Sequence, residues 1–247
     1  MKRYQVLFID LDNTLYDFTG NSREAYRVVY TLLDYGQWFT SFEHYYSIYE
    51  EHNLKLWALY AEGIISKEKL NEERYAHPLR VIGVRDAEVI GARFWDEAMH
   101  RLPLGDRLMP YAREILEYLR PRYRMYILSN GFTELQSHKM RSAGIDGYFD
   151  GVILSEDIGV NKPNPEIFYH ALRVAGVEAS DALMIGDNYE VDIEGAYHVG
   201  MDQVFYNIGQ MTNKDDKLMI KADTKDGIDV LLPTYSIDSL LQLKDIL

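Results

Sequence analysis

Short, nearly continuous apolar runs alternate along most of the chain with longer segments of helical periodicity. Five of these runs are rich in residues that favour strands: Tyr4–Ile9, Met125–Leu128, Val152–Leu154, Leu183–Ile185 and Gln203–Tyr206. A run that is apolar at almost every position is typical of a strand buried on both faces, as in a parallel sheet. The pattern therefore predicts a central parallel sheet.

Helical patterns lie between these runs, and most of them end at a glycine. They cover Pro110–Leu119, Thr133–Ala143, Pro165–Ala175 and Glu190–Val199, the last three being followed directly by glycine. Glycine is a common helix stop because it adopts the left-handed conformation that ends a helix. The alternation predicts an α/β fold built on a Rossmann-like, doubly wound parallel sheet.

The stretch between the first and second runs contains helical patterns only. Four helices are predicted there: Ser22–Leu33, Phe42–Glu62, Ser66–Ile82 and Asp86–Arg101. Ser22, Ser66 and Asp86 are the predicted caps. Pro78 is expected to kink or split the third helix, because proline lacks the amide hydrogen that helix interiors use. We therefore expect a helical insert over residues 17–103 and a core made of residues 1–16 and 104–247.

The end of the chain carries weaker signals. The charged segment Met211–Gly227 has little periodicity and predicts a surface loop, whereas Ser236–Ile246 predicts a terminal helix.

Composition excludes several classes of function. The chain of 247 residues has a net charge of −13, which disfavours nucleic acid polymers and anionic membranes as partners. Its lack of cysteine excludes thiol nucleophiles and cysteine-ligated metal sites, and fits a reducing compartment. No apolar stretch is long enough to span a bilayer, and Asp10 and Asp12 interrupt the first run too early for a signal peptide. We expect a cytoplasmic monomer or homodimer that acts on a small molecule.

Polar side chains follow each of the first four predicted strands. In doubly wound folds the ligand crevice lies at the carboxyl ends of the strands, so these groups are expected to converge. In chain order they are Asp10, Asp12 and Thr14, then Ser129 and Asn130, then Lys162, and finally Asp187 and Asp192.

The chemistry of this set favours a magnesium and phosphate site. Carboxylates such as Asp10 and Asp187 are the hard oxygen ligands that Mg²⁺ prefers, and Lys162, Ser129 and loop amides suit phosphate oxygens. Two neighbouring acids, Asp10 and Asp12, can divide the roles of nucleophile and proton donor. Each group also has a structural interpretation, because Asp, Thr and Lys are common in turns and at helix caps.

Four sequence motifs carry these residues: FIDLDNTL, LSNG, NKPNPEIF and GDNYEVD. With these motifs in this order, the chain resembles the haloacid dehalogenase superfamily over roughly residues 2–16 and 104–207, and the helical insert resembles its C1-type cap. The resemblance implies that Asp10 attacks phosphorus and that Asp12 is the general acid and base. It implies Mg²⁺ held by Asp10, the Asp12 carbonyl and Asp187, and a phosphoryl group held by Thr14, Ser129 and Asn130. Lys162 would neutralise charge, and Asp192 would orient Lys162 or a metal-bound water.

Longer segments resemble the bacterial pyrimidine 5′-nucleotidase branch, namely LYDFTGNSREAY, LWALYAEGIISKEKLNEERY and LSNGFTELQSHKMRSAGI. This resemblance implies a nucleoside 5′-monophosphate as substrate. Phe18, Trp57, Tyr60 and Arg74 are candidates for contacts with its base, although aromatics at helical spacing are more often core residues.

Four other functions stay open. A sugar phosphate phosphatase resembling N-acylneuraminate-9-phosphatase and a phosphosugar mutase would keep the nucleophile. A 2-haloacid dehalogenase is disfavoured by Asp12, and a non-catalytic binding protein is disfavoured by the intact set of polar groups.

Overall fold

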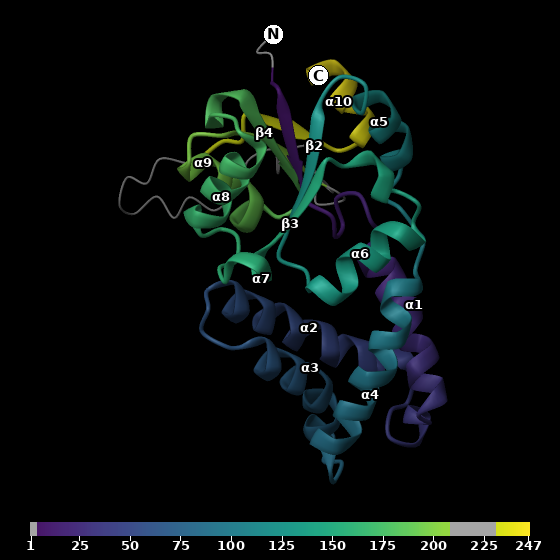
Figure 1. Ribbon diagram of the computed structural model, residues 1–247. Coiled ribbons are helices and arrows are strands. Elements are labelled where there is room, and N and C mark those ends of the chain that lie inside the picture. Colours follow the sequence, from purple (N-terminus) through teal and green to yellow (C-terminus); the bar gives the residue numbers. More distant parts are fainter. Residues whose placement is uncertain (1–3, 208–230) are drawn as a thin grey trace. The chain divides into compact units, whose positions relative to one another are not determined.

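The computed structural model describes residues 4–207 and 231–247 of the chain (Figure 1). Six parallel strands form one sheet in the order β3-β2-β1-β4-β5-β6. They are β1 (Val6–Ile9), β2 (Arg124–Ser129), β3 (Gly151–Leu154), β4 (Ala182–Gly186), β5 (Asp202–Tyr206) and β6 (Tyr235–Ile237). The five predicted strands and the α/β parallel-sheet fold are confirmed.

Helices cover both faces of this sheet. Figure 1 shows α8 and α9 on one face and α5 and α10 on the other, as a doubly wound sheet requires. Their bounds are α5 (Ala112–Leu119), α7 (Ser155–Ile158), α8 (Pro165–Ala175), α9 (Gly195–His198) and α10 (Leu243–Ile246). Val6 and Phe8 of β1 pack with Ile167 and Phe168 of α8, so one face of the core is made of alternate strand residues and one helix.

The chain divides into two compact units. The sheet unit contains residues 1–16, 108–130 and 147–247, and the helical unit contains residues 17–107 and 131–146. Relative to the predicted division, residues 104–107 and the segment 131–146, which carries one further helix, group with the helical insert.

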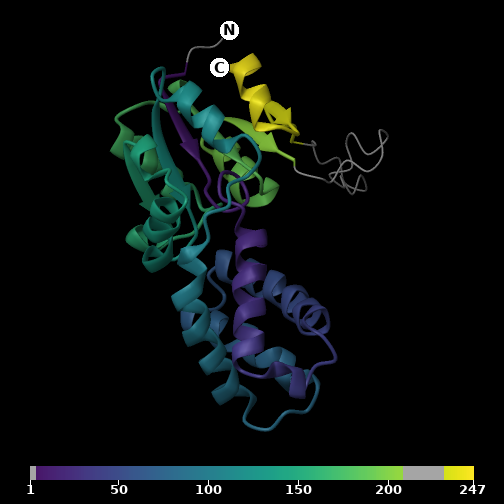
Figure 2. The same ribbon diagram turned by 90° about the vertical axis from the view of Figure 1, so that its right-hand side faces the viewer.

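The helical unit consists of α1 (Phe18–Leu32), α2 (Phe42–Ala61), α3 (Lys67–Val81), α4 (Ala87–Arg101) and α6 (Thr133–Ser142). In both views α4 lies beside α1 and α3 (Figure 2). The interior of this unit is largely aromatic, and five of its tyrosines are almost fully buried: Tyr26, Tyr35, Tyr45, Tyr49 and Tyr75.

Two predictions about helix starts need correction. Helix α1 begins at Phe18 rather than Ser22, because the Asp17 side chain accepts a hydrogen bond from the Gly20 amide. Asp86 occupies a cap position but makes no capping hydrogen bond, whereas the Ser66 cap is confirmed. Pro78 lies inside α3, which continues from Lys67 to Val81, so this proline does not split the helix.

The end of the chain also differs from the prediction. Within Ser236–Ile246 the structure has the end of β6, a turn and the short helix α10, since a three-residue strand is too short to show a pattern. The predicted helix Glu190–Val199 is a π-helical turn, Tyr189–Glu194, followed by α9. The predicted loop Met211–Gly227 lies outside the described residues.

Short 3₁₀ turns complete the secondary structure. They occupy Tyr35–Gln37, Leu102–Leu104, Asp146–Tyr148, Ala179–Asp181 and Leu240–Gln242.

Candidate active site

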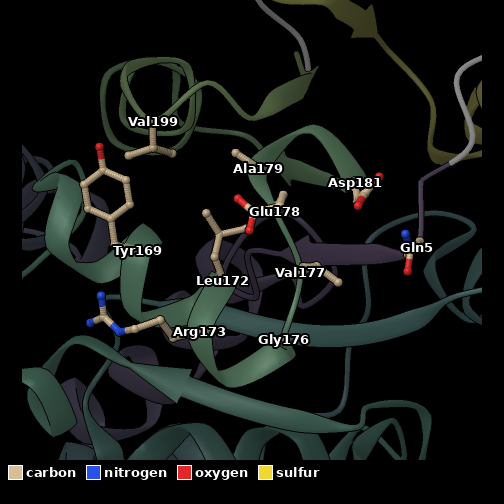
Figure 3. A pocket seen from close by; sticks show the side chains of 10 residues that line it. All are labelled: Gln5, Tyr169, Leu172, Arg173, Gly176, Val177, Glu178, Ala179, Asp181 and Val199. Atoms are coloured by element: carbon tan, nitrogen blue, oxygen red, sulfur yellow. The ribbon is translucent and has the colours of Figure 1, made fainter.

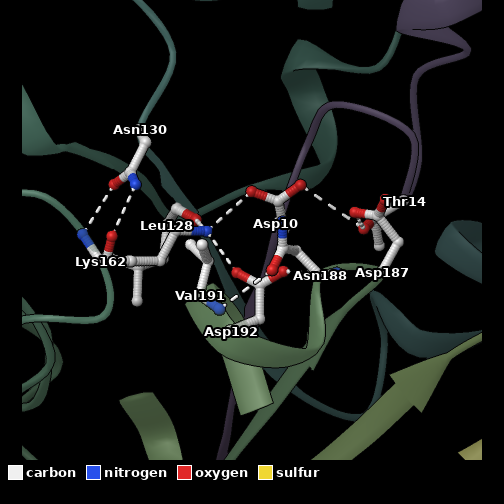
Figure 4. Close-up of polar contacts among 9 residues, drawn as sticks. All are labelled: Asp10, Thr14, Leu128, Asn130, Lys162, Asp187, Asn188, Val191 and Asp192. Carbon is white, nitrogen blue, oxygen red and sulfur yellow. Dashed lines mark hydrogen bonds and ion pairs between the residues drawn. The ribbon is translucent and has the colours of Figure 1, made fainter. Parts of the chain in front are cut away.

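Lys162 lies at the centre of the polar groups at the carboxyl ends of the strands (Figure 4). Its ammonium donates hydrogen bonds to Asp10 Oδ1 at 2.7 Å, to Asp192 Oδ1 at 2.6 Å and to the Leu128 carbonyl at 2.7 Å. An ammonium has three N–H groups, so all three are used. With 1% of its surface exposed, Lys162 is held in one position between Asp10, which follows β1, and Asp192, which lies in the π-helical turn after β4.

The side chain of Asn130 fastens the loop that carries Lys162. Its Nδ2 donates to the Lys162 carbonyl at 2.9 Å, and its Oδ1 accepts from the Lys162 amide at 2.8 Å. Asn130 was predicted to bind phosphate, and this role of its side chain was not predicted. No signal could have revealed it, because the partners are backbone groups 32 residues away.

Thr14 connects the first and fourth strand ends. Its hydroxyl lies 3.1 Å from Asp187 Oδ1 and 3.5 Å from Asp10 Oδ2. A hydroxyl has one proton to donate, and the shorter distance favours Asp187. Fully buried Thr14 thereby holds Asp187 beside Asp10.

Asp192 has both carboxylate oxygens engaged. Oδ1 accepts from Lys162, and Oδ2 accepts from the Asn188 amide at 3.1 Å. The side chain fits because residue 186 is glycine, since a Cβ at Gly186 would lie 2.3 Å from Asp192 Oδ2. This arrangement suits a residue that positions Lys162.

The site contains more carboxylates than ammonium groups. Burial raises the pKa of Asp10 well above its usual range, and the charges of Asp192 and Asp187 add to this against the opposing effect of Lys162. Burial, with the charge of Asp192, raises the pKa of Asp187 to about 7. Burial alone would lower the pKa of Lys162, but the charges of Asp10 and Asp192 raise it above its ordinary value. One ammonium therefore faces three carboxylates.

This donor set fits a divalent cation. Oxygen atoms of Asp10, Asp187 and Asp192 lie within 4.8 Å of one another, and all are hard ligands. Because both oxygens of Asp192 already accept hydrogen bonds, Asp10 and Asp187 are the better placed ligands. Within the described part of the chain, the Asp12 carboxylate does not belong to this cluster of three carboxylates. The family resemblance implies that Asp12 would bind the metal through its carbonyl oxygen instead.

Two other predicted residues lie in the same unit. Asp12 lies two residues beyond Asp10 and is half-buried, and its backbone forms an isolated parallel β-bridge with that of Tyr16. Ser129 is the last residue of β2 and is buried. The structure therefore brings the core residues of the predicted site to one end of the sheet.

The four candidate specificity residues, Phe18, Trp57, Tyr60 and Arg74, all lie in the helical unit. The rings of Trp57 and Tyr60 meet edge to face at 5.6 Å, and Trp57 stacks on Phe132 at 5.4 Å. The Lys139 ammonium lies 4.3 Å from the ring centre of Phe18. Phe132, which follows the LSNG motif directly, was not among the predicted residues.

A pocket of about 610 Å³ lies elsewhere in the sheet unit (Figure 3). Gln5 and Asp181 precede β1 and β4, so they mark the amino ends of these strands, opposite to the carboxylates. No predicted site residue lines this pocket. Its lining consists of Gln5, Tyr169, Leu172, Arg173, Gly176, Val177, Glu178, Ala179, Asp181 and Val199.

Within residues 4–207 and 231–247, no helix is both long enough and apolar enough to cross a membrane.

Comparison with known proteins gives consistent matches. The model of the haloacid dehalogenase-like hydrolase family matches residues 4–200. The HAD-hydrolase YfnB of Bacillus subtilis is 27% identical, with 100% of this chain and 97% of that protein covered. The pyrimidine 5′-nucleotidase YjjG of Escherichia coli is 29% identical, with 99% of this chain and 98% of that protein covered.

A phosphatase of another substrate class matches at similar identity. The N-acylneuraminate-9-phosphatase of Homo sapiens is 27% identical, with 100% of this chain and 95% of that protein covered. Among solved structures, magnesium-bound YfnB has a TM-score of 0.84 at 26% identity, with 99% of both chains covered.

Proposed function

This chain belongs to the haloacid dehalogenase-like hydrolase family, and we propose that it is a magnesium-dependent phosphatase that cleaves nucleoside 5′-monophosphates through an aspartyl-phosphate. The observation that carries the proposal is the Lys162 ammonium, which holds Asp10 and Asp192 on one side while Asp187 lies next to Asp10. This gives one carboxylate in position to attack, with a cation beside it.

In the first half of the reaction, an oxygen of Asp10 attacks phosphorus while the bond from phosphorus to the leaving oxygen breaks. Asp12 gives its proton to that leaving oxygen. Thr14, Ser129 and the Asn130 main-chain amide bind the phosphoryl oxygens, and Lys162 balances their charge. Bound Mg²⁺, held by Asp10, Asp187 and the Asp12 carbonyl, would supply charge stabilisation and alignment.

In the second half, Asp12 takes a proton from water, and the water oxygen attacks phosphorus. The bond between phosphorus and Asp10 breaks, which restores the Asp10 carboxylate and releases inorganic phosphate. Asp192 keeps Lys162 in place throughout, because it holds one of the three ammonium N–H groups.

The nucleotide is the narrower part of the proposal. It rests on the likeness to YjjG, a pyrimidine 5′-nucleotidase, and on the aromatic residues of the helical unit, which we assign as the C1-type cap. A sugar phosphate is the second candidate, favoured by the comparable likeness to an N-acylneuraminate-9-phosphatase.

The test is phosphate release from a panel of nucleoside monophosphates and sugar phosphates, with Mg²⁺ and with EDTA. Metal-dependent release that favours deoxypyrimidine monophosphates supports the proposal. Release from sugar phosphates alone keeps the chemistry and replaces the substrate. Absence of release from every ester would overturn the phosphatase assignment in favour of a mutase or a binding protein.

A further inference from the structure

Lys162 is held at both of its ends by the carboxyl end of β2. Lys162 lies in the connection between α7 and α8, and the Asn130 side chain bonds to its amide and to its carbonyl group. At the other end of the same residue, the ammonium donates to the Leu128 carbonyl. Leu128 is the penultimate residue of β2 and Asn130 follows the strand, so one strand end fixes both the backbone and the charged tip of Lys162 (Figure 4).

The residue type at position 130 matches this task. The Lys162 amide is a donor and its carbonyl is an acceptor, so a side chain that binds both must offer one acceptor and one donor. A carboxamide offers the two on neighbouring atoms without carrying a charge, and the distances to Lys162 are 2.8 Å and 2.9 Å. An aspartate here would set an oxygen against the Lys162 carbonyl oxygen. The Asn130 side chain is therefore suited to anchor the backbone rather than to transfer protons.

An anchor on the backbone matters because the partners of the ammonium change during the proposed reaction. When Asp10 bonds to phosphorus, its negative charge moves to the phosphoryl group, so the attraction between Asp10 and the Lys162 ammonium weakens. Lysine carries its charge on a flexible four-carbon stem, and a tip with a weakened partner can move. The two bonds from Asn130 involve no reacting atom, so they hold the Lys162 backbone throughout the reaction.

We propose that Asn130 is a positioning residue for phosphoryl transfer, whose side chain fixes the Lys162 backbone so that the ammonium stays aligned as charge passes from Asp10 to the phosphoryl group. This inference rests on the proposed phosphatase function and gives the Asn130 side chain a task separate from that of its main-chain amide. Because the two tasks belong to different atoms, a substitution of the side chain removes one and leaves the other.

Hydrolysis of p-nitrophenyl phosphate by the magnesium-loaded enzyme tests this task. Asn130→Ala is expected to lower kcat by about 10- to 100-fold, because a misplacement of about 1 Å can cost that much. KM should change by less than about threefold, because the main-chain amide of residue 130 remains.

The matched control is Ser155→Ala. Ser155 is buried directly after β3, and its hydroxyl has no hydrogen-bond partner among the described residues, so both kinetic constants should keep their wild-type values. A wild-type kcat in Asn130→Ala would overturn the inference.

Amide hydrogen exchange, followed by NMR, separates local anchoring from a general loss of stability. The Lys162 amide donates to Asn130 Oδ1, so Asn130→Ala should accelerate its exchange at least about tenfold more than that of the Phe8 amide in β1. Equal acceleration at the two amides would show a merely structural role and would contradict the inference. A protein that cleaves no ester would end the phosphatase proposal, whereas faster exchange at Lys162 would still support the anchoring task.

A second variant serves if circular dichroism shows that Asn130→Ala is unfolded. Asn130→Asp keeps the shape of the side chain and the acceptor for the Lys162 amide, but it replaces the donor to the Lys162 carbonyl by an oxygen. We expect kcat to fall at least about tenfold. Acetylation of Lys162 by acetic anhydride, measured by mass spectrometry, should rise severalfold, because the displaced ammonium is less well buried. Wild-type values of both quantities would overturn the inference.

Discussion

The sheet unit and the helical unit bury polar groups in different ways. In the sheet unit, Lys162, Asp192 and Asn130 make hydrogen bonds with one another and with nearby backbone, and each is held by more than one bond. In the helical unit, tyrosine rings fill the interior, and most of the buried side-chain polar atoms without a partner among the described residues occur there. A satisfied network is pre-organised for chemistry, whereas a buried polar atom without a partner lowers stability.

Removal of the proposed nucleophile in the sheet unit is expected to have the largest effect on activity. Asp10→Asn keeps the size of the side chain but removes the attacking carboxylate, so phosphate release is expected to fall at least about 10⁴-fold. The circular dichroism spectrum should stay unchanged, since asparagine has nearly the same size and shape as aspartate. Asp181→Asn, a half-buried carboxylate at the amino end of β4, is the control and should keep full activity. Activity in Asp10→Asn would remove the nucleophile assignment.

The buried cation of the sheet unit should contribute strongly to stability. Lys162→Met leaves Asp10 and Asp192 buried without their common partner, and the free energy of unfolding is expected to fall by about 3–5 kcal/mol. Urea denaturation measures the change. Lys244→Met, which removes an exposed ion pair with Glu114, should cost less than about 1 kcal/mol. Equal effects of the two substitutions would show that burial of the Lys162 network does not matter.

Hydroxyl bonding in the helical unit can be tested with two buried tyrosines. The Tyr26 hydroxyl lies 2.9 Å from that of Tyr75 and 3.1 Å from that of Tyr49, whereas the buried Tyr45 hydroxyl has no hydrogen-bond partner among the described residues. Tyr26→Phe is expected to lower the free energy of unfolding by about 1–3 kcal/mol, because it leaves buried hydroxyls unpaired. Tyr45→Phe should be neutral or stabilising, because it removes an unpaired group. The reverse order in thermal unfolding would refute this account of the packing.

Magnesium binding in the sheet unit should depend on pH. Burial and the charge of Asp192 raise the pKa of Asp187 to about 7 in the metal-free protein, and Mg²⁺ requires the deprotonated carboxylate. Calorimetry is therefore expected to give about tenfold weaker Mg²⁺ binding at about pH 6 than at about pH 8. Equal affinity at the two pH values would mean that Asp187 does not compete between proton and metal.

The stability contributions of the two units should respond to acid in opposite directions. The raised pKa of Asp187 means that the folded metal-free protein binds a proton more tightly than the unfolded chain, so this contribution grows as pH falls below about 7. His52 and His77 stack at 3.6 Å, and burial, with neighbouring positive charge, lowers the pKa of both. Their contribution is present above the ordinary histidine value of 6.5 and is lost as pH falls through it.

The effect of the stacked histidine pair on the pH dependence of stability is the smallest of the expected effects. His77→Phe should reduce the loss of melting temperature between about pH 7.5 and about pH 5.5, because one of the two protonation sites is gone. His138→Phe, an exposed histidine on α6 of the same unit, should leave that loss unchanged. An unchanged pH dependence in His77→Phe would show that the stacked pair does not govern it.

Much of the fold followed from local pattern. The β1 run is apolar at every position because the strand is buried on both faces, and this leaves a signal in four consecutive residues. The convergence of Asp10, Lys162 and Asp187 was also predictable, because parallel strands place their carboxyl ends at one edge. The three-residue strand β6 was missed since it is too short to carry a period, and the start of α1 was missed because Asp17 was not recognised as its cap.

The sequence by itself determined the sheet, the helical insert and the residue types that meet at the strand ends, because these depend on periodicity and on motif order. Only the tertiary structure decided which groups satisfy one another. The Asn130 side chain bonds to the backbone of Lys162, and the Lys162 ammonium bonds to the Leu128 carbonyl. Such pairings join backbone atoms distant along the chain, and backbone atoms are the same at every residue. For the same reason, only the tertiary structure shows that Asn71 Oδ1 and Arg74 Nε have no hydrogen-bond partner among the described residues.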